Sequence, residues 1–552
     1  MRFELFFPES VHPGPITGRM FLIATRSEKS EPRLQLFDVP FFAADVKGLK
    51  AGESAVIDVA TPGFPLRSLA ELPPGDYYVQ GLLNIYTEFH RSDGHIIWAH
   101  MDQWEGQDVA RSPGNLISGV KTVNFDPQCG CKLKLELNKT IPPIEVPPDT
   151  EWVKRIKFQS QLLSRFWGQP IYLGATILLP RGYNAHPKLH YPVVYVQGHF
   201  SHDAPFGFKT EPDPPETKSC ARRREECNGR RLNMLEPPLD VDFNGSQYNV
   251  ESGYEFYQSW ISDDFPRVIA VTFQHPTPYF DDSYGINSAN AGPYGDALMG
   301  ELIPAVEERV RVIRQPYARV LTGCSTGGWS SLALQAYYPD FFGGAWIFCP
   351  DPVDFRRYYG GVNLYEDQNA FVVSPGNEWF SAERHCFRSP TGQVRFSNRE
   401  FSRLTSMTGP QDPGYAWVNY TPVGSDGYPR PVWDLATGQI DREVVDYMKT
   451  HDYDLREYLE RNWSQIGPQL AGKLYLYCGD EDGGYFNLAV YLLEDFLANT
   501  QKPYYDGAFH YGRPLKGHGW QPMTNAELVR TMAARVAEHA PAHQEANARS
   551  RN

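Results

Sequence analysis

The run Arg319-Val320-Leu321-Thr322-Gly323-Cys324-Ser325-Thr326-Gly327-Gly328-Trp329 places the pattern Gly-x-Ser-x-Gly between a short apolar strand and a predicted helix. Apolar residues follow at helical spacing until Pro339 ends the pattern. A serine in so tight a turn needs glycines on both sides, and its hydroxyl is exposed at the carboxyl end of the strand. The stretch predicts a nucleophile elbow, with Ser325 as the nucleophile and the backbone N–H of Thr326 as one oxyanion donor.

A serine nucleophile needs a base and an orienting acid, and in such folds the chain order is Ser, then Asp or Glu, then His. The predicted strand 473–478 ends in Gly479-Asp480-Glu481-Asp482. We predict Asp482 as the acid, because the third residue beyond the glycine can point back across the sheet edge; Asp480 is the alternative. His518, in a glycine-flanked loop between a strand and a helix, is the predicted base.

The loop after the predicted strand 192–197 should supply the second oxyanion donor, from the backbone of His199 or Phe200. The spacing of His199, His202 and Asp203 also permits a metal site. However, no Glu stands beside the first histidine and no third ligand follows at a familiar spacing. The sequence therefore predicts neither a metal nor a cofactor.

From Ile171 onward, apolar strands alternate with amphipathic helices, a pattern typical of a mainly parallel α/β sheet with helices on both faces. Strands are predicted at 171–179, 192–197, 267–273, 319–322, 345–349, 473–478 and 505–511. Two insertions, at about 200–265 and 360–469, interrupt the alternation. We expect one or both to cover the carboxyl edge of the sheet and to wall the substrate pocket.

The N-terminal part predicts a small all-β sandwich domain over residues 1–140. Its predicted strands cover 19–26, 33–39, 53–59, 76–86, 95–101 and 119–126. The prolines of 141–150 predict an extended linker. The catalytic domain is expected at 151–540, followed by a polar tail at 541–552.

The composition excludes several classes of protein. The 552 residues are 41% apolar and 21% charged, which is ordinary for a globular chain. The formal net charge of -14 argues against a nucleic-acid partner. No apolar run is long enough to span a membrane, and the first residues do not form a signal peptide. We expect a cytoplasmic protein with reduced thiols, and the oligomeric state stays open.

Four segments together resemble the putative-esterase family of α/β-hydrolases, which includes enterochelin esterases, esterase D, feruloyl esterases and mycolyltransferases. They are residues 191–200, 292–298, the elbow and 517–520. The resemblance covers roughly 151–538 and implies that Ser325 is the nucleophile, His518 the base and Asp482 the acid. The chain has Gln197-Gly198 where the family more usually has His-Gly.

These residues predict a serine carboxylic-ester hydrolase that acts through an acyl-enzyme. The expected substrate is a small-molecule or carbohydrate-linked ester. Two alternatives stay open, namely an acyltransferase that uses the same triad and a non-catalytic binding protein on the same fold.

Overall fold

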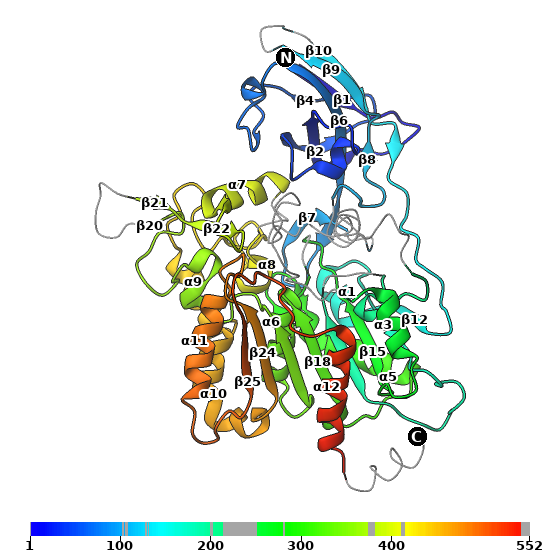
Figure 1. The fold of residues 1–552 in the computed structure, drawn as a ribbon. Coiled ribbons are helices and arrows are strands. Elements are labelled where there is room, and N and C mark those ends of the chain that lie inside the picture. The colour runs from blue at the N-terminus through cyan, green and yellow to red at the C-terminus, as the bar shows by residue number, and fades with distance from the viewer. Residues whose placement is uncertain are drawn as a thin grey trace.

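The computed structural model describes residues 2–101, 104, 109–126, 130, 132–198, 202–212, 251–279, 282–373, 381–409 and 414–541. Its largest α/β unit is built on an eight-stranded sheet (Figure 1). In spatial order the strands are β12 (Val153–Gln159), β13 (Tyr172–Leu178), β15 (Ile269–Gln274), β14 (Val193–Gln197), β18 (Arg319–Cys324), β19 (Gly344–Phe348), β24 (Leu474–Gly479) and β25 (Ala508–Gly512). All neighbours from β15 to β25 are parallel, whereas β12 and β13 run antiparallel. The predicted mainly parallel sheet is confirmed.

Successive side chains of the strands point to opposite faces of this sheet, and helices cover both faces. In β14, Val193 and Tyr195 enter one buried cluster and Val194 enters the other. The first cluster is covered by α5 (Ile303–Arg309), α6 (Thr326–Tyr337), α10 (Leu455–Leu470) and α11 (Asn487–Ala498), and the second by α3 (Gly253–Trp260) and α12 (Asn525–Glu538). Near-continuous apolar strands such as β14 need this double cover.

The N-terminal part forms two further sheets. A three-stranded sheet contains β10 (Lys132–Glu136), β1 (Arg2–Phe6) and β4 (Ala55–Ile57). An eight-stranded sheet is centred on β6 (Gly75–His90) and also contains β2 (Ile16–Thr25), β3 (Phe41–Leu49), β5 (Gly63–Phe64), β7 (Ile96–His100), β8 (Leu116–Ile117), β9 (Lys121–Phe125) and β11 (Lys139–Thr140). Buried side chains of both sheets, among them Leu5, Leu22 and Leu83, share one cluster.

One predicted strand, 33–39, is wrong. The structure has a 3-10 helix there, over Pro32–Gln35. Proline at its first position fixes φ and has no N–H to donate to a ladder, so the alternating side chains that follow never join a sheet. The side chain of Gln35 then donates to the Ser30 carbonyl at 2.8 Å and holds the turn.

The second insertion lies between the central sheet and the N-terminal sheets (Figure 1). It contains α7 (Asn398–Thr408), α8 (Trp417–Tyr420), α9 (Arg442–Thr450) and the short strands β20 (Val372–Val373), β21 (Ala382–Glu383), β22 (His385–Arg388) and β23 (Val394–Ser397). Arg403 donates to the Gly63 carbonyl at 2.6 Å, and the Tyr428 hydroxyl donates to the Trp98 carbonyl at 2.8 Å. The insertion is thus bonded to the N-terminal strands. Residues 213–250 of the first insertion lie outside the described residues.

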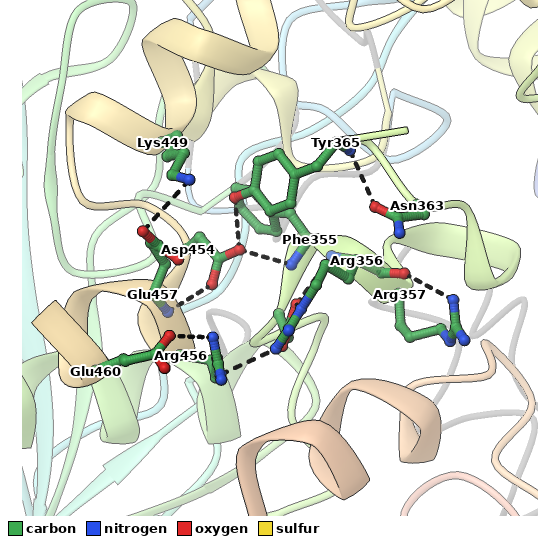
Figure 2. A network of polar contacts seen from close by, with 11 residues as sticks. Phe355, Arg356, Arg357, Asn363, Tyr365, Lys449, Asp454, Arg456, Glu457 and Glu460 are labelled. Carbon is green, nitrogen blue, oxygen red and sulfur yellow. Dashed lines mark hydrogen bonds and ion pairs between the residues drawn. The ribbon is translucent and has the colours of Figure 1, made fainter. Parts of the chain in front are cut away.

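A buried carboxylate, Asp454, fixes the segment that follows β19 (Figure 2). Its Oδ2 accepts hydrogen bonds from the Phe355 N–H at 2.8 Å and the Tyr365 hydroxyl at 2.7 Å. Its Oδ1 accepts from the Glu457 N–H at 3.0 Å and so caps α10. Burial and the nearby charge of Asp354 raise the pKa of Asp454 to about 6. This network anchors the chain that follows β19.

Within the described ranges, no helix is both long and apolar enough to cross a membrane.

Candidate active site

Ser325 lies in the tight turn between β18 and α6, with φ 58° and ψ -125°. An L-residue adopts such angles only when its surroundings hold it there. A Cβ added to Gly323 would lie 2.4 Å from the Gly327 carbonyl oxygen, and one added to Gly327 would lie 2.3 Å from that of Gln197. Both glycines of the motif are therefore required by close backbone approach, and the predicted elbow geometry is present.

His518 and Asp482 are brought together although 36 residues separate them. Nδ1 of the His518 ring donates to Oδ2 of Asp482 at 2.8 Å, and both side chains are buried. The other oxygen of Asp482 accepts from the N–H groups of Gly484 at 2.9 Å and Phe486 at 3.3 Å. These donors hold the carboxylate in place, so it can orient the imidazole.

The loops that carry this acid and this base are joined through their backbones. The Glu481 N–H donates to the Lys516 carbonyl at 2.9 Å. A Cβ on Gly479 would lie 2.3 Å from the carbonyl oxygens of both Lys516 and Gly517, so only glycine allows this approach. The glycine that ends β24 thus sets the spacing between Asp482 and His518.

Asp480, the alternative acid, lies elsewhere. Its carboxylate pairs with Arg513 and accepts a hydrogen bond from the Tyr491 hydroxyl at 2.8 Å. The structure therefore places Asp482, and not Asp480, against His518.

The Ser325 hydroxyl donates to a second buried carboxylate, Asp351, with 3.1 Å between Oγ and Oδ1. In the part of the chain that the structure describes, no hydrogen bond joins Ser325 to His518. Asp351 Oδ2 also accepts from the Tyr284 hydroxyl at 2.6 Å and the Thr326 hydroxyl at 3.2 Å. Free enzymes often show such unformed catalytic bonds. A proton transfer from Ser325 to His518 would require the serine hydroxyl to turn away from Asp351.

The electrostatic surroundings of His518 favour its protonated form. Burial alone lowers the pKa of this imidazole, but the charge and hydrogen bond of Asp482 outweigh burial, with further help from Cys349 and Asp351. Together they raise the pKa of His518 to about 9. The protonated imidazolium form of His518 is thus strongly stabilised.

Three cysteines lie close to this pair. Cys349 and Cys478 are buried, whereas Cys324 is exposed. Burial raises the pKa of the Cys349 thiol, but hydrogen bonds from the thiols of Cys324 and Cys478 and the charge of His518 lower it well below its ordinary value. Nothing in the sequence pattern indicated that these three cysteines, each at or just beyond the end of a different strand, lie close together in the fold.

The described part of the oxyanion region is the start of α6. Thr326 is the first residue of this helix, and the first N–H groups of a helix have no acceptor within it. His199 and Phe200, the other predicted donors, lie outside the described residues. His199 is also the first ligand of the alternative metal site, so that site is not fully described. Of its other two residues, His202 accepts a hydrogen bond from Arg155 through its backbone carbonyl at 2.7 Å.

A chain of aromatic rings and one arginine connect the second insertion to this site. The Phe486 ring meets the His518 ring edge-on at 5.6 Å, and Tyr359 packs between Phe486 and Tyr415. Arg388 pairs with Glu481 at 2.7 Å, and its backbone N–H donates to the Gly483 carbonyl at 2.9 Å. The insertion therefore supports the loop that carries Asp482.

Comparison with known proteins finds one matching family. Residues 172–398 match the family described as "Putative esterase". This part of the chain is similar to that esterase family. The expected resemblance to putative esterases is confirmed, and the expectation of an esterase is confirmed with it. No curated protein sequence matches the chain.

Several solved structures of esterases are similar to this esterase chain. One is a ferulic acid esterase with 13% identity and a TM-score of 0.35, which covers 70% of this chain and 98% of its own. Another is an S-formylglutathione hydrolase from Agrobacterium tumefaciens, with 11% identity, a TM-score of 0.32 and coverage of 70% and 98%. A third is a ferulic acid esterase from Anaeromyces mucronatus, with 13% identity, a TM-score of 0.27 and coverage of 71% and 94%.

Proposed function

We propose that this esterase is a serine carboxylic-ester hydrolase that works through an acyl-enzyme. The proposal rests on the buried Asp482–His518 pair together with a serine in an elbow turn at the carboxyl end of the same sheet. Ser325 would attack the ester carbonyl after its proton passes to Nε2 of His518, while Asp482 holds the imidazole in the required tautomer. The Thr326 N–H would stabilise the oxyanion, together with a donor from His199 or Phe200.

The second half of the reaction reuses the same groups. His518 would return its proton to the leaving alcohol and then take one from water, which attacks the acyl carbonyl and frees Ser325. The residues need no metal or cofactor for these steps. Asp351 would hold the serine hydroxyl in the free enzyme and release it when substrate turns the hydroxyl toward His518.

The pH dependence of hydrolysis should follow the pKa of His518. Only the neutral imidazole can accept the serine proton, and a pKa of about 9 leaves most of the free enzyme protonated at pH 7. We expect kcat/KM to rise about tenfold per pH unit below that pKa and to level off above it. Initial rates on a neutral aryl acetate, corrected for spontaneous hydrolysis, measure this.

Folding is followed by circular dichroism at each pH, so that loss of structure is not mistaken for titration. If kcat/KM were already constant from pH 7 upward, Asp482 would not raise the pKa of His518 as expected. Asp351→Asn removes one of the charges that raise this pKa, so its pH profile should shift to lower pH.

The arginine that braces the acid loop should affect turnover without touching substrate. Arg388→Ala removes the pair with Glu481 and the cation–π contact with the Tyr485 ring, 4.4 Å away. Because small displacements of catalytic groups are costly, we expect kcat to fall roughly tenfold with KM little changed. Steady-state kinetics measure the split between the two constants.

Arg399→Ala is the matched control, because Arg399 belongs to the same insertion but pairs with the exposed Glu383. It should leave kcat unchanged. Equal effects of the two substitutions would mean that the insertion contributes only general stability.

We also propose that the substrate is a small-molecule or carbohydrate-linked ester and that the aromatic side chains of the second insertion wall its pocket. The proposed domain limits are 1–140 for a β-sandwich, 141–150 for the linker and 151–540 for the catalytic domain. In this arrangement the β-sandwich supports the insertion.

A screen of aryl esters of graded acyl length, feruloyl esters and acetylated sugars, run beside Ser325→Ala, tests the substrate class. Added acceptor alcohols distinguish hydrolysis from acyl transfer, since a transferase would form a new ester instead of free acid. A protein that binds these esters without releasing acid would fit the non-catalytic alternative.

A further inference from the structure

The three thiols form a cluster directly behind the proposed acid and base. Phe348 of β19 lies opposite Tyr477 of β24, so the next residues, Cys349 and Cys478, are neighbours on parallel strands. Both belong to the same buried cluster on one face of the sheet. Cys324, at the end of β18, contacts Cys349 and is exposed, so it gives the buried pair a connection to solvent.

The spacing of this cluster suits a cation. One ligand atom each from Cys349, Cys478 and Asp482 lies within 4.8 Å of the others. Around a tetrahedral zinc ion with Zn–S bonds of about 2.3 Å, ligand atoms lie about 3.7 Å apart. A small contraction would therefore bring two sulfurs and one carboxylate oxygen to bonding distance. Two thiolates with a carboxylate select soft or borderline divalent cations.

We propose that Cys349, Cys478 and Asp482 form an inhibitory site for a thiophilic divalent cation such as Zn²⁺ or Cd²⁺. On binding, the protons still held by the thiols pass to solvent, two metal–sulfur bonds and one metal–oxygen bond form, and water fills the fourth position. The ion draws the Asp482 carboxylate away from His518. The proposed base then loses the acid that orients it.

Binding of the ion rests on the thiols and the carboxylate alone, whereas inhibition rests also on the proposed function. The two are therefore measured separately. Cd²⁺ is titrated into the full-length, reduced, chelator-free protein, and the ultraviolet charge-transfer absorption of cadmium thiolates reports binding. Zn²⁺ is titrated in parallel while ester hydrolysis is followed.

Because the chain has eight cysteines, the difference between variants is the decisive signal. The double variant Cys349→Ser/Cys478→Ser should lose the absorption of one two-thiolate site per chain. Cys386→Ser, which removes another buried cysteine outside the cluster, should keep it. The same cadmium absorption in both variants would overturn the site.

Saturating Zn²⁺ should lower the hydrolysis rate of the wild-type protein at least tenfold, and EDTA should restore it. Cys478→Ser alone should raise the half-inhibitory zinc concentration at least tenfold, each variant being compared with its own uninhibited rate. An unchanged zinc response in Cys478→Ser would place inhibition elsewhere and overturn the proposed mechanism of inhibition. Cadmium binding without any loss of hydrolysis would overturn the inhibitory role.

Discussion

Ser325→Ala should abolish both ester hydrolysis and covalent labelling by a fluorophosphonate probe. Removing the nucleophile leaves His518 with no hydroxyl to activate, and the loss of a triad member typically lowers kcat by a factor on the order of 10⁴ or more. Thermal unfolding should change little, because within the described part of the chain the Ser325 Oγ makes one side-chain hydrogen bond, to Asp351. Intact-protein mass spectrometry and initial rates provide the two readouts.

Ser330→Ala is the matched control. Ser330 lies on α6, the helix that follows Ser325, and its hydroxyl bonds back to the Thr326 carbonyl at 2.8 Å. This variant should keep labelling and hydrolysis. A probe adduct that survives in Ser325→Ala, located on another serine by peptide mapping, would remove Ser325 from the mechanism.

Asp482→Asn should depress kcat by several powers of ten while KM changes little. An amide in this place no longer stabilises the imidazolium and favours the wrong tautomer, an effect of about 10⁴ in the best-studied serine protease triad. Asp480→Asn should cost at most a few-fold, since Asp480 faces Arg513 and Tyr491. Steady-state kinetics of the two variants, with folding checked by circular dichroism, give the comparison.

The reverse ranking would transfer the acid role to Asp480. Near-normal rates in both variants would move it to another strand, and Asp351 and Asp354 after β19 would be tested next. Of these two, Asp351 contacts Ser325, whereas Asp354 pairs with Arg356 and caps the following turn.

Features that depend on local sequence could be predicted well. The elbow follows from two glycines whose missing Cβ atoms permit backbone contact, and this requirement is visible in the motif itself. The strands β14, β18, β19 and β24 are apolar on both faces, which marks them as central strands. Strand β12 was missed because its polar and charged residues, such as the exposed Lys157 and Gln159, suit an edge strand and resemble a loop.

Features that depend on neighbouring strands could not be read from one stretch of sequence. Asp351 reaches Ser325 only because β18 and β19 are parallel neighbours, and the thiol cluster forms for the same reason between β19 and β24. Cys349 also adopts φ 39°, which a pattern of residue types does not reveal. The support of the acid loop by Arg388 joins residues 94 positions apart. Such contacts require the fold itself.

Arg91 has a consequence for how the chain can be divided. This buried guanidinium donates to the Tyr279 hydroxyl at 3.2 Å, the Ala289 carbonyl at 3.0 Å and the Gly427 carbonyl at 3.1 Å. Proteolysis within 141–150 would therefore cut the polypeptide without separating its halves, because both still share this arginine and one buried cluster. In a catalytic fragment that begins at Glu151, the Tyr279 hydroxyl and the Ala289 and Gly427 carbonyls would lose the donor Arg91. Apolar side chains of the shared buried cluster would also become exposed. We therefore expect the segments on either side of 141–150 to unfold together as one cooperative unit.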